Sequence, residues 1–312
     1  MFIDPGIGNN SSTKTRISEF LPIGTTGVAG PWATWQKDPD ETMAFMLLIG
    51  GGGSGAGGFT GAAGAIRGGG GGGGSGAIAR GLIPLFSLPK TLYVQPGLGG
   101  SSVAASTNGN TGNISYVCVQ PNVTAANVVM QSGAAKASNT VATAGTVAAA
   151  GAGGTAETIS TVLLCMLSQC GLTQFIAGKV GAAAGAVTGA AGVANVLLTA
   201  SIMNGGSGGG STSAANGEFA GGAQTGAGIF PTIAGGTSGG NPGHGAGGQI
   251  YMYETMLGYG GTGGACGGAA GTTAGNGGDG SFPGGGGGGG GGGVTGGRGG
   301  RGGDGVVYII SW

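Results

Sequence analysis

Ten consecutive glycines, residues 284–293, constrain this chain more than any other feature of its sequence. A second run of seven glycines covers residues 68–74. An α-helix built from such a run loses about 1 kcal/mol for each glycine relative to alanine. Glycine also loses more backbone entropy on folding than any other residue. Any ordered glycine run therefore depends on dense hydrogen bonding between its own backbone and neighbouring backbones.

The regular conformation left to such a run is a left-handed helix of the polyproline II type, with three residues per turn and a rise of about 3.1 Å per residue. Several of these helices packed side by side donate and accept across their neighbours, because no Cβ keeps them apart. Residues 296–304 read Gly-Gly-Arg, Gly-Gly-Arg, Gly-Gly-Asp, so Arg298, Arg301 and Asp304 fall on one edge. The sequence thus predicts a bundle of polyglycine II-type helices.

Composition favours a folded chain. Glycine supplies 86 of 312 residues, yet 39% of residues are hydrophobic, 6% are charged and the net charge is zero. Disordered chains have the opposite balance, with few apolar residues and high net charge. The Arg-Gly-Gly triplets at Arg67, Arg298 and Arg301 are typical of RNA-binding tails, but phosphate binding needs clustered cations in excess. We therefore expect no nucleic acid partner.

Two apolar segments at opposite ends of the chain have the length and composition of strands. Residues 42–49 follow a turn at residues 37–40 and contain no alternating polar residues after Thr42, which predicts a central strand. Residues 306–310 are rich in β-branched and aromatic side chains. We expect these two strands to pair and to form a β-sheet base from both chain ends.

Further strands are expected at residues 90–95, 113–119 and 249–257, each of which carries β-branched or aromatic residues. The predicted fold class is mainly β with irregular glycine-rich packing. It combines the sheet base with the polyglycine II-type bundle.

Residues 156–203 depart from this scheme, because they contain many helix-forming residues and no adjacent glycines. Thr155 is a candidate N-cap and Glu157 suits the first turn, so a short α-helical insert is one prediction. Additional three-fold packing is the alternative. Residues 180–203 carry no charge and are long enough to span a bilayer, so a membrane-active segment is a third reading.

The domain organisation follows from these composition changes. Residues 1–30 have ordinary composition and are expected to be an anchor arm that contacts other proteins; they lack the pattern of a signal peptide. Residues 31–312 form the glycine-rich structural domain, with an insert at about 108–205 that is rich in alanine and threonine.

Candidate chemistry is sparse. The one histidine, His244, lies in a glycine-rich loop, and the Gly-x-Ser-x-Gly matches at Ser207 and Ser238 also lie in glycine loops. The four cysteines form no Cys-x-x-Cys pair, so no zinc site is indicated. We expect no catalytic, metal-binding or cofactor-binding residues and no enzymatic activity.

The two ends of the domain resemble the glycine-rich domain of bacteriophage tail-fibre and virion proteins. The opening, WQKDPDETMAFMLLIGGGGSGAGG from Trp35, runs from a turn through an apolar strand into glycines, and the ending is GGDGVVYIISW. The interior LIPLFSLPKTLYVQPGLGG is similar to the middle strand of that family. The resemblance covers roughly residues 32–100 and 245–312. It implies a polyglycine-helix adhesin whose rigid bundle displays loops to a host receptor.

These observations predict a non-enzymatic phage virion protein: a tail-fibre, spike or capsid decoration component, with host attachment as one role. Residues 230–244 and 251–259 are candidate contact loops, although the identity of any receptor-binding residue stays open. The uncharged surface favours a homo-oligomer, and the expected location is the virion surface. The alternatives are a cellular extracellular or cell-wall glycine-rich protein, and a membrane-active virion protein using residues 180–203.

Overall fold

The computed structural model describes residues 15–24, 30–133, 135, 173–186, 189–196, 203–226, 231–238, 243–245, 247, 250–251, 257–268 and 272–312. The strands within these ranges are β1 (Arg16–Phe20), β2 (Ala33–Gln36), β3 (Met43–Ile49), β4 (Ile78–Pro84), β5 (Thr91–Gln95), β6 (Tyr116–Cys118), β7 (Val128–Gln131), β8 (Thr173–Ile176), β9 (Asn195–Val196), β10 (Gln224–Thr225), β11 (Ile250–Tyr251), β12 (Leu257–Gly258) and β13 (Val306–Ser311). Two short 3-10 helices, η1 (Leu85–Ser87) and η2 (Ala125–Asn127), interrupt the connections.

Two antiparallel sheets form the base of the molecule. One has the order β1-β13-β3-β4-β8 and the other β2-β5-β6-β7. Alternate residues of β3, Ala44, Met46 and Leu48, are fully buried and pack with Leu92 of β5 and Val117 of β6. The strands thus use their period of two to bury one face between the sheets. This two-sheet core is the apolar foundation from which the glycine-rich segments extend.

The predicted pairing of the chain ends is confirmed. Strand β13 pairs antiparallel with β3, with Val306 opposite Ile49 and Ile310 opposite Phe45. The strands expected at residues 90–95 and 113–119 are present as β5 and β6. The prediction of a single strand at residues 249–257 is wrong, because β11 and β12 are two short strands that pair with each other in antiparallel fashion.

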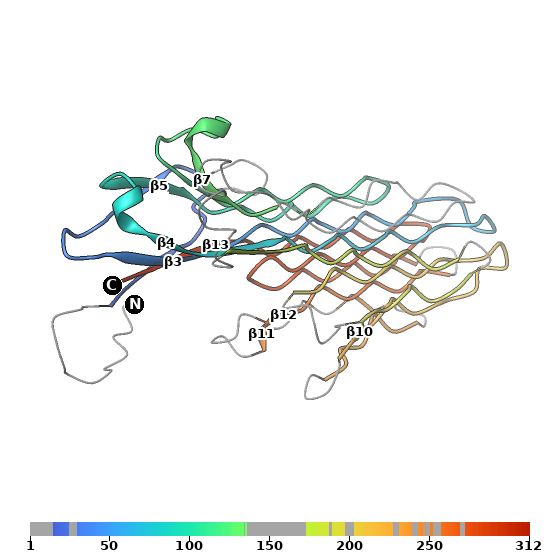
Figure 1. The fold of residues 1–312 in the computed structure, drawn as a ribbon. Coiled ribbons are helices and arrows are strands. Elements are labelled where there is room, and N and C mark those ends of the chain that lie inside the picture. Colours follow the sequence, from blue (N-terminus) through green and yellow to red (C-terminus); the bar gives the residue numbers. More distant parts are fainter. Residues whose placement is uncertain are drawn as a thin grey trace.

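Glycine-rich segments connect the strands and run side by side away from the sheets (Figure 1). We call them rods. Their backbone hydrogen bonds repeat every three residues. In rod 50–59, the amides of Gly52, Gly55 and Gly58 donate to carbonyls of rod 296–304 at 2.9, 3.0 and 2.9 Å. The next residue of each triplet donates to rod 68–76 instead (Gly53, Ala56 and Phe59).

Rod 284–293 lies at the centre and is hydrogen-bonded to six others. Its neighbours are rods 50–59, 68–76, 203–212, 259–268, 273–281 and 296–304. Three consecutive residues reach all six. Gly287 donates to Gly53 and accepts from Gly73; Gly288 donates to Gly278 and accepts from Gly300; Gly289 donates to Ser207 and accepts from Gly264. Every residue of this rod is buried, so bare backbone forms the interior of the bundle.

The helical prediction for residues 156–203 is wrong wherever the structure describes that range. Residues 173–186, 189–196 and 203 contain strands β8 and β9 and rod segments, and no helix. The amides of Ala182 and Gly185 donate to Gly206 and Gly209, again with a spacing of three. A Cβ on Gly181 would lie 2.1 Å from the oxygen of Gly72, so close backbone contact replaces helix formation. Residues 156–172, 187–188 and 197–202 lie outside the described residues.

Candidate functional site

The molecule has two structurally distinct ends. Rod 50–59 continues directly from β3, and rod 68–76 leads back into β4, so the turn at residues 60–67 lies at the end of the bundle farthest from the sheets. The C-terminus and β1 lie together at the sheet end (Figure 1). We call these two ends the base and the far tip.

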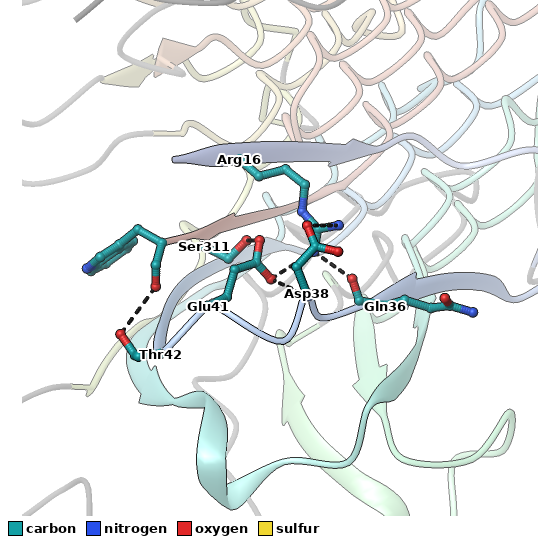
Figure 2. Close-up of polar contacts among 7 residues, drawn as sticks. Arg16, Gln36, Asp38, Glu41, Thr42 and Ser311 are labelled. Atoms are coloured by element: carbon teal, nitrogen blue, oxygen red, sulfur yellow. Dashed lines mark hydrogen bonds and ion pairs between the residues drawn. The ribbon is translucent and has the colours of Figure 1, made fainter. Parts of the chain in front are cut away.

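A polar cluster at the base holds the N-terminal strand to the rest of the molecule (Figure 2). Arg16 of β1 donates to Glu41 at 3.0 Å and lies over the ring of Trp35, with 5.1 Å between the guanidinium carbon and the ring centroid. The other oxygen of Glu41 accepts from the hydroxyl of Ser311 at 2.6 Å, and the amide of Asp38 donates to Glu41 at 2.9 Å. One carboxylate thus joins strand β1, the turn before β3 and the last strand.

Burial makes Glu41 the centre of this base cluster. Its side chain is 6% exposed, whereas that of Arg16 is 34% exposed and that of Asp38 is 66% exposed. A buried carboxylate needs several donors to offset its lost hydration, and Glu41 has three. Residues 16–20 of the expected anchor arm are therefore fastened into the base sheet.

Arg67 organises the far tip. Its side chain is fully buried, and Nε donates to Thr212 Oγ1 at 3.0 Å. Nη2 donates to Asn216 Oδ1 at 2.7 Å and to the carbonyl of Gly268 at 2.9 Å. Asn216 Oδ1 also accepts from the amide of Gly64 at 2.9 Å. One guanidinium thus ties three connections of the tip together, and its burial lowers its pKa.

The sequence did not single out Arg67, because its Arg-Gly-Gly setting matches RNA-binding triplets. The structure separates the three triplet arginines: Arg298 is exposed, Arg301 is half-buried and Arg67 is inside. The sequence feature that could have identified Arg67 is its position, since it is the one charged residue between Glu41 and Arg80. In this chain, the lone charge between uncharged runs makes specific polar contacts.

The candidate contact loops fall partly within the described residues. Residues 231–238 line the flank of the bundle, where Ile233 pairs with Gln224. Tyr259 is fully buried, and its hydroxyl donates to the carbonyl of Pro231 at 3.3 Å, so it supports the bundle from inside. Strands β11 and β12 lie below the rods, nearer the sheets than the far tip (Figure 1). Residues 239–242 and 252–256 are not among the described residues.

The residues considered for catalysis have structural contacts. Ser207 is fully buried, and its hydroxyl donates to the carbonyl of Ala223 at 2.7 Å inside the bundle. His244 is exposed and accepts the amide of Asn276 through Nδ1 at 2.9 Å. Ser238 is exposed. These positions do not bring the serines and the histidine into a hydrogen-bonded catalytic arrangement in the described part of the chain.

The two described cysteines, Cys118 and Cys266, are free and buried. Burial raises the pKa of the Cys118 thiol to about 12 and that of Cys266 to about 11. Across the described ranges, no group of three His, Cys, Asp or Glu residues is placed to hold a metal ion.

Among the residues that the structure describes, no helix has the length and apolar character needed to cross a bilayer. No family model and no curated protein matches this chain.

Proposed function

We propose that this chain is a non-enzymatic structural protein of a bacteriophage virion, a tail-fibre, spike or decoration component that presents its far tip away from the particle. The proposal rests on the resemblance of both domain ends to phage glycine-rich domains and on the geometry of a base, a bundle and a tip. Its function in this view is mechanical: a rigid bundle positions exposed turns at a distance from the attachment point.

The rods are proposed to be polyglycine II helices. Three residues per turn would direct successive amides at intervals of 120°, so every third amide would meet the same neighbour. The observed bonds of rod 50–59 to rods 296–304 and 68–76 have this period. The six neighbours of rod 284–293 are the single observation that supports the proposal best, since six is the number that hexagonal packing of three-fold rods requires.

Such a bundle would be rigid for a physical reason. A glycine rod has no side-chain rotamers to populate, and a buried backbone group without a partner costs roughly 1–3 kcal/mol. Bending the bundle would break several of these bonds at once, because each rod is bonded along its length. A stiff and uncharged spacer suits a protein that must hold a surface away from a particle.

The base is proposed as the attachment end. Residues 1–30 would contact other virion proteins, with β1 fastened by the Arg16–Glu41 cluster so that force on the arm passes into the five-stranded sheet. The turn at residues 60–67 would then face outward at the far tip, together with the loops that Arg67 ties to it. A host surface receptor is the proposed partner for this end.

Immunogold electron microscopy of purified phage particles tests the assignment. Antibody against the chain should label intact particles at a fixed position, and label confined to lysed host material would contradict a virion location. Amide hydrogen exchange of the assembled protein tests the scaffold separately. Residues 284–293 should exchange far more slowly than a free peptide, whereas free-peptide rates would rule out bonded rods.

A further inference from the structure

Two opposite edges of the bundle differ in chemistry. In the ring around rod 284–293, hydrogen bonds link rod 203–212 to rods 68–76 and 259–268, and rod 296–304 to rods 50–59 and 273–281. Rods 203–212 and 296–304 are therefore opposite members of the ring. Rod 190–196 is bonded to the outer side of rod 203–212, which makes it the edge farthest from rod 296–304.

The edge at rod 296–304 is charged and closed. Arg298 is exposed and Arg301 is half-buried. Their outward amides do not remain free, because Arg298 N–H donates to Asn276 Oδ1 at 2.8 Å and Arg301 N–H donates to Asp279 Oδ1 at 2.7 Å. Side chains from the adjacent rod thus occupy the positions where a further rod would bond. This arrangement protects the edge as charged residues protect the edge strand of a sheet.

The edge at rod 190–196 is uncharged and open, and we call it the valine edge. Val193 is 49% exposed and Val196 is 43% exposed. The amides of Gly192 and Val193 bond inward, to Ala220 at 3.0 Å and Ala183 at 3.2 Å. Ala191 and Ala194, also exposed and three residues apart, have no backbone bond to any described residue through either N–H or C=O.

Among the described residues of the bundle, the large hydrophobic side chains that are exposed lie on this side. The exposed large hydrophobic residues of the described chain fall into a base group and a bundle group, and the bundle group consists of Val180, Val193 and Val196. Val180 begins rod 180–186, which lies beside rod 190–196 through the bond between Val193 and Ala183. The valine edge therefore combines open backbone groups at three-residue spacing with an apolar rim.

We propose that the valine edge binds a second copy of this chain, rod against rod. An occupant must offer carbonyls and amides at the same three-residue spacing, carry no charge opposite the valines and allow close backbone approach. The valine edge of a second copy meets all three conditions, and the two open edges then form an isologous, two-fold interface. The charged edge at rod 296–304 does not meet these conditions, because its pairing with the valines would desolvate Arg298 and Arg301 without giving them a partner.

This inference rests on the proposed polyglycine II rods, which set the spacing of the open groups. Sedimentation velocity of the full chain over a range of concentrations tests it. Wild-type protein should form dimers, and the double variant Val193→Asp, Val196→Asp should raise the dimer dissociation constant at least roughly tenfold, because like charges would face each other across the interface. Val123→Asp is the matched control, since this valine is 54% exposed but lies at the base.

A second measurement locates the contact. Ala194→Cys should be joined between two copies by a short bismaleimide, while Ala62→Cys, exposed in the turn of the far tip, should not be. Wild-type protein that stays monomeric, or equal cross-linking of both variants, would overturn the inference. Slow amide exchange at residues 284–293 in the same samples would show that the rods exist even so, whereas fast exchange would remove both the rods and the interface.

Discussion

Replacing Gly289 by alanine places one methyl group at the centre of the bundle. A Cβ there would lie 1.9 Å from the carbonyl oxygen of Gly70, 2.5 Å from its carbonyl carbon and 3.0 Å from the amide nitrogen of Gly209. These atoms are backbone, so no side chain can rotate away. To restore ordinary van der Waals contact, rod 68–76 must move away from rod 284–293 by about 1.5 Å and rod 203–212 by about 0.4 Å.

The cost follows from the bonds that this movement strains. Six hydrogen bonds join rod 284–293 to those two rods, with donors Gly70, Gly73, Gly76, Gly286, Gly289 and Gly292. Losing about three of them at about 1 kcal/mol each, together with about 1–3 kcal/mol for overpacking, gives about 4–6 kcal/mol. Alanine lowers the conformational entropy of the unfolded chain, which offsets about 0.4–1 kcal/mol of this destabilisation. We expect a net destabilisation of about 3–6 kcal/mol.

Chemical denaturation of two separate variants, Gly289→Ala and the control Gly247→Ala, measures this loss of stability. Gly247 is exposed, and a Cβ there would have its nearest heavy atom at 3.8 Å, so that variant should be neutral or more stable by up to about 1 kcal/mol. If Gly289→Ala unfolds within about 1 kcal/mol of Gly247→Ala, then the interior rods have room for side chains. The reasoning about bare backbone packing would then be refuted.

Three further predictions concern single side chains. Glu41→Ala should lower the free energy of unfolding by about 2–3 kcal/mol in denaturation experiments, because three donors lose a buried acceptor, while Asp40→Ala, at an exposed position, should change it little. Arg67→Met should lower it by about 2–4 kcal/mol and speed amide exchange in the tip turn, since three acceptors lose their donor; unchanged exchange there would contradict its tying role. The thiols of Cys118 and Cys266 stay protonated to higher pH in the folded protein than in the unfolded chain, so the free energy of unfolding should fall as the pH rises above about 9 and should not change for this reason at lower pH. Both thiols should also resist alkylation at pH 8 until denaturant is added.

The sheet base was predictable because side chains encode it. The apolar runs at residues 42–49 and 306–310 identified β3 and β13 and their pairing. Strand β4 was missed because its sequence, IARGLIP, holds a glycine and a proline, which are depleted in strands. Strand β1 was missed because RISEF contains three polar residues and only two apolar ones, within a segment of ordinary composition.

The sequence predicted that glycine-rich segments bond side by side, but not which segments are neighbours. A glycine run disfavours an α-helix, and a rod without side chains carries no pattern that says which rod lies beside it. The same reasoning explains the error at residues 173–186, where alanine and glycine suit a helix locally but also allow the close contacts that rod packing needs. The role of Arg67 depends on which connections meet at the tip, so it became visible only with the fold.

The bonding of rod 284–293 does not depend on chain direction. Its amides donate to rod 50–59 in parallel register, and its carbonyls accept from rod 68–76 in antiparallel register, both with the same three-residue period. A lattice that accepts either direction can add two antiparallel segments at its border without redesigning an apolar centre. Domains of this construction can therefore gain width by duplicating a short glycine-rich hairpin, while their existing turns keep their positions.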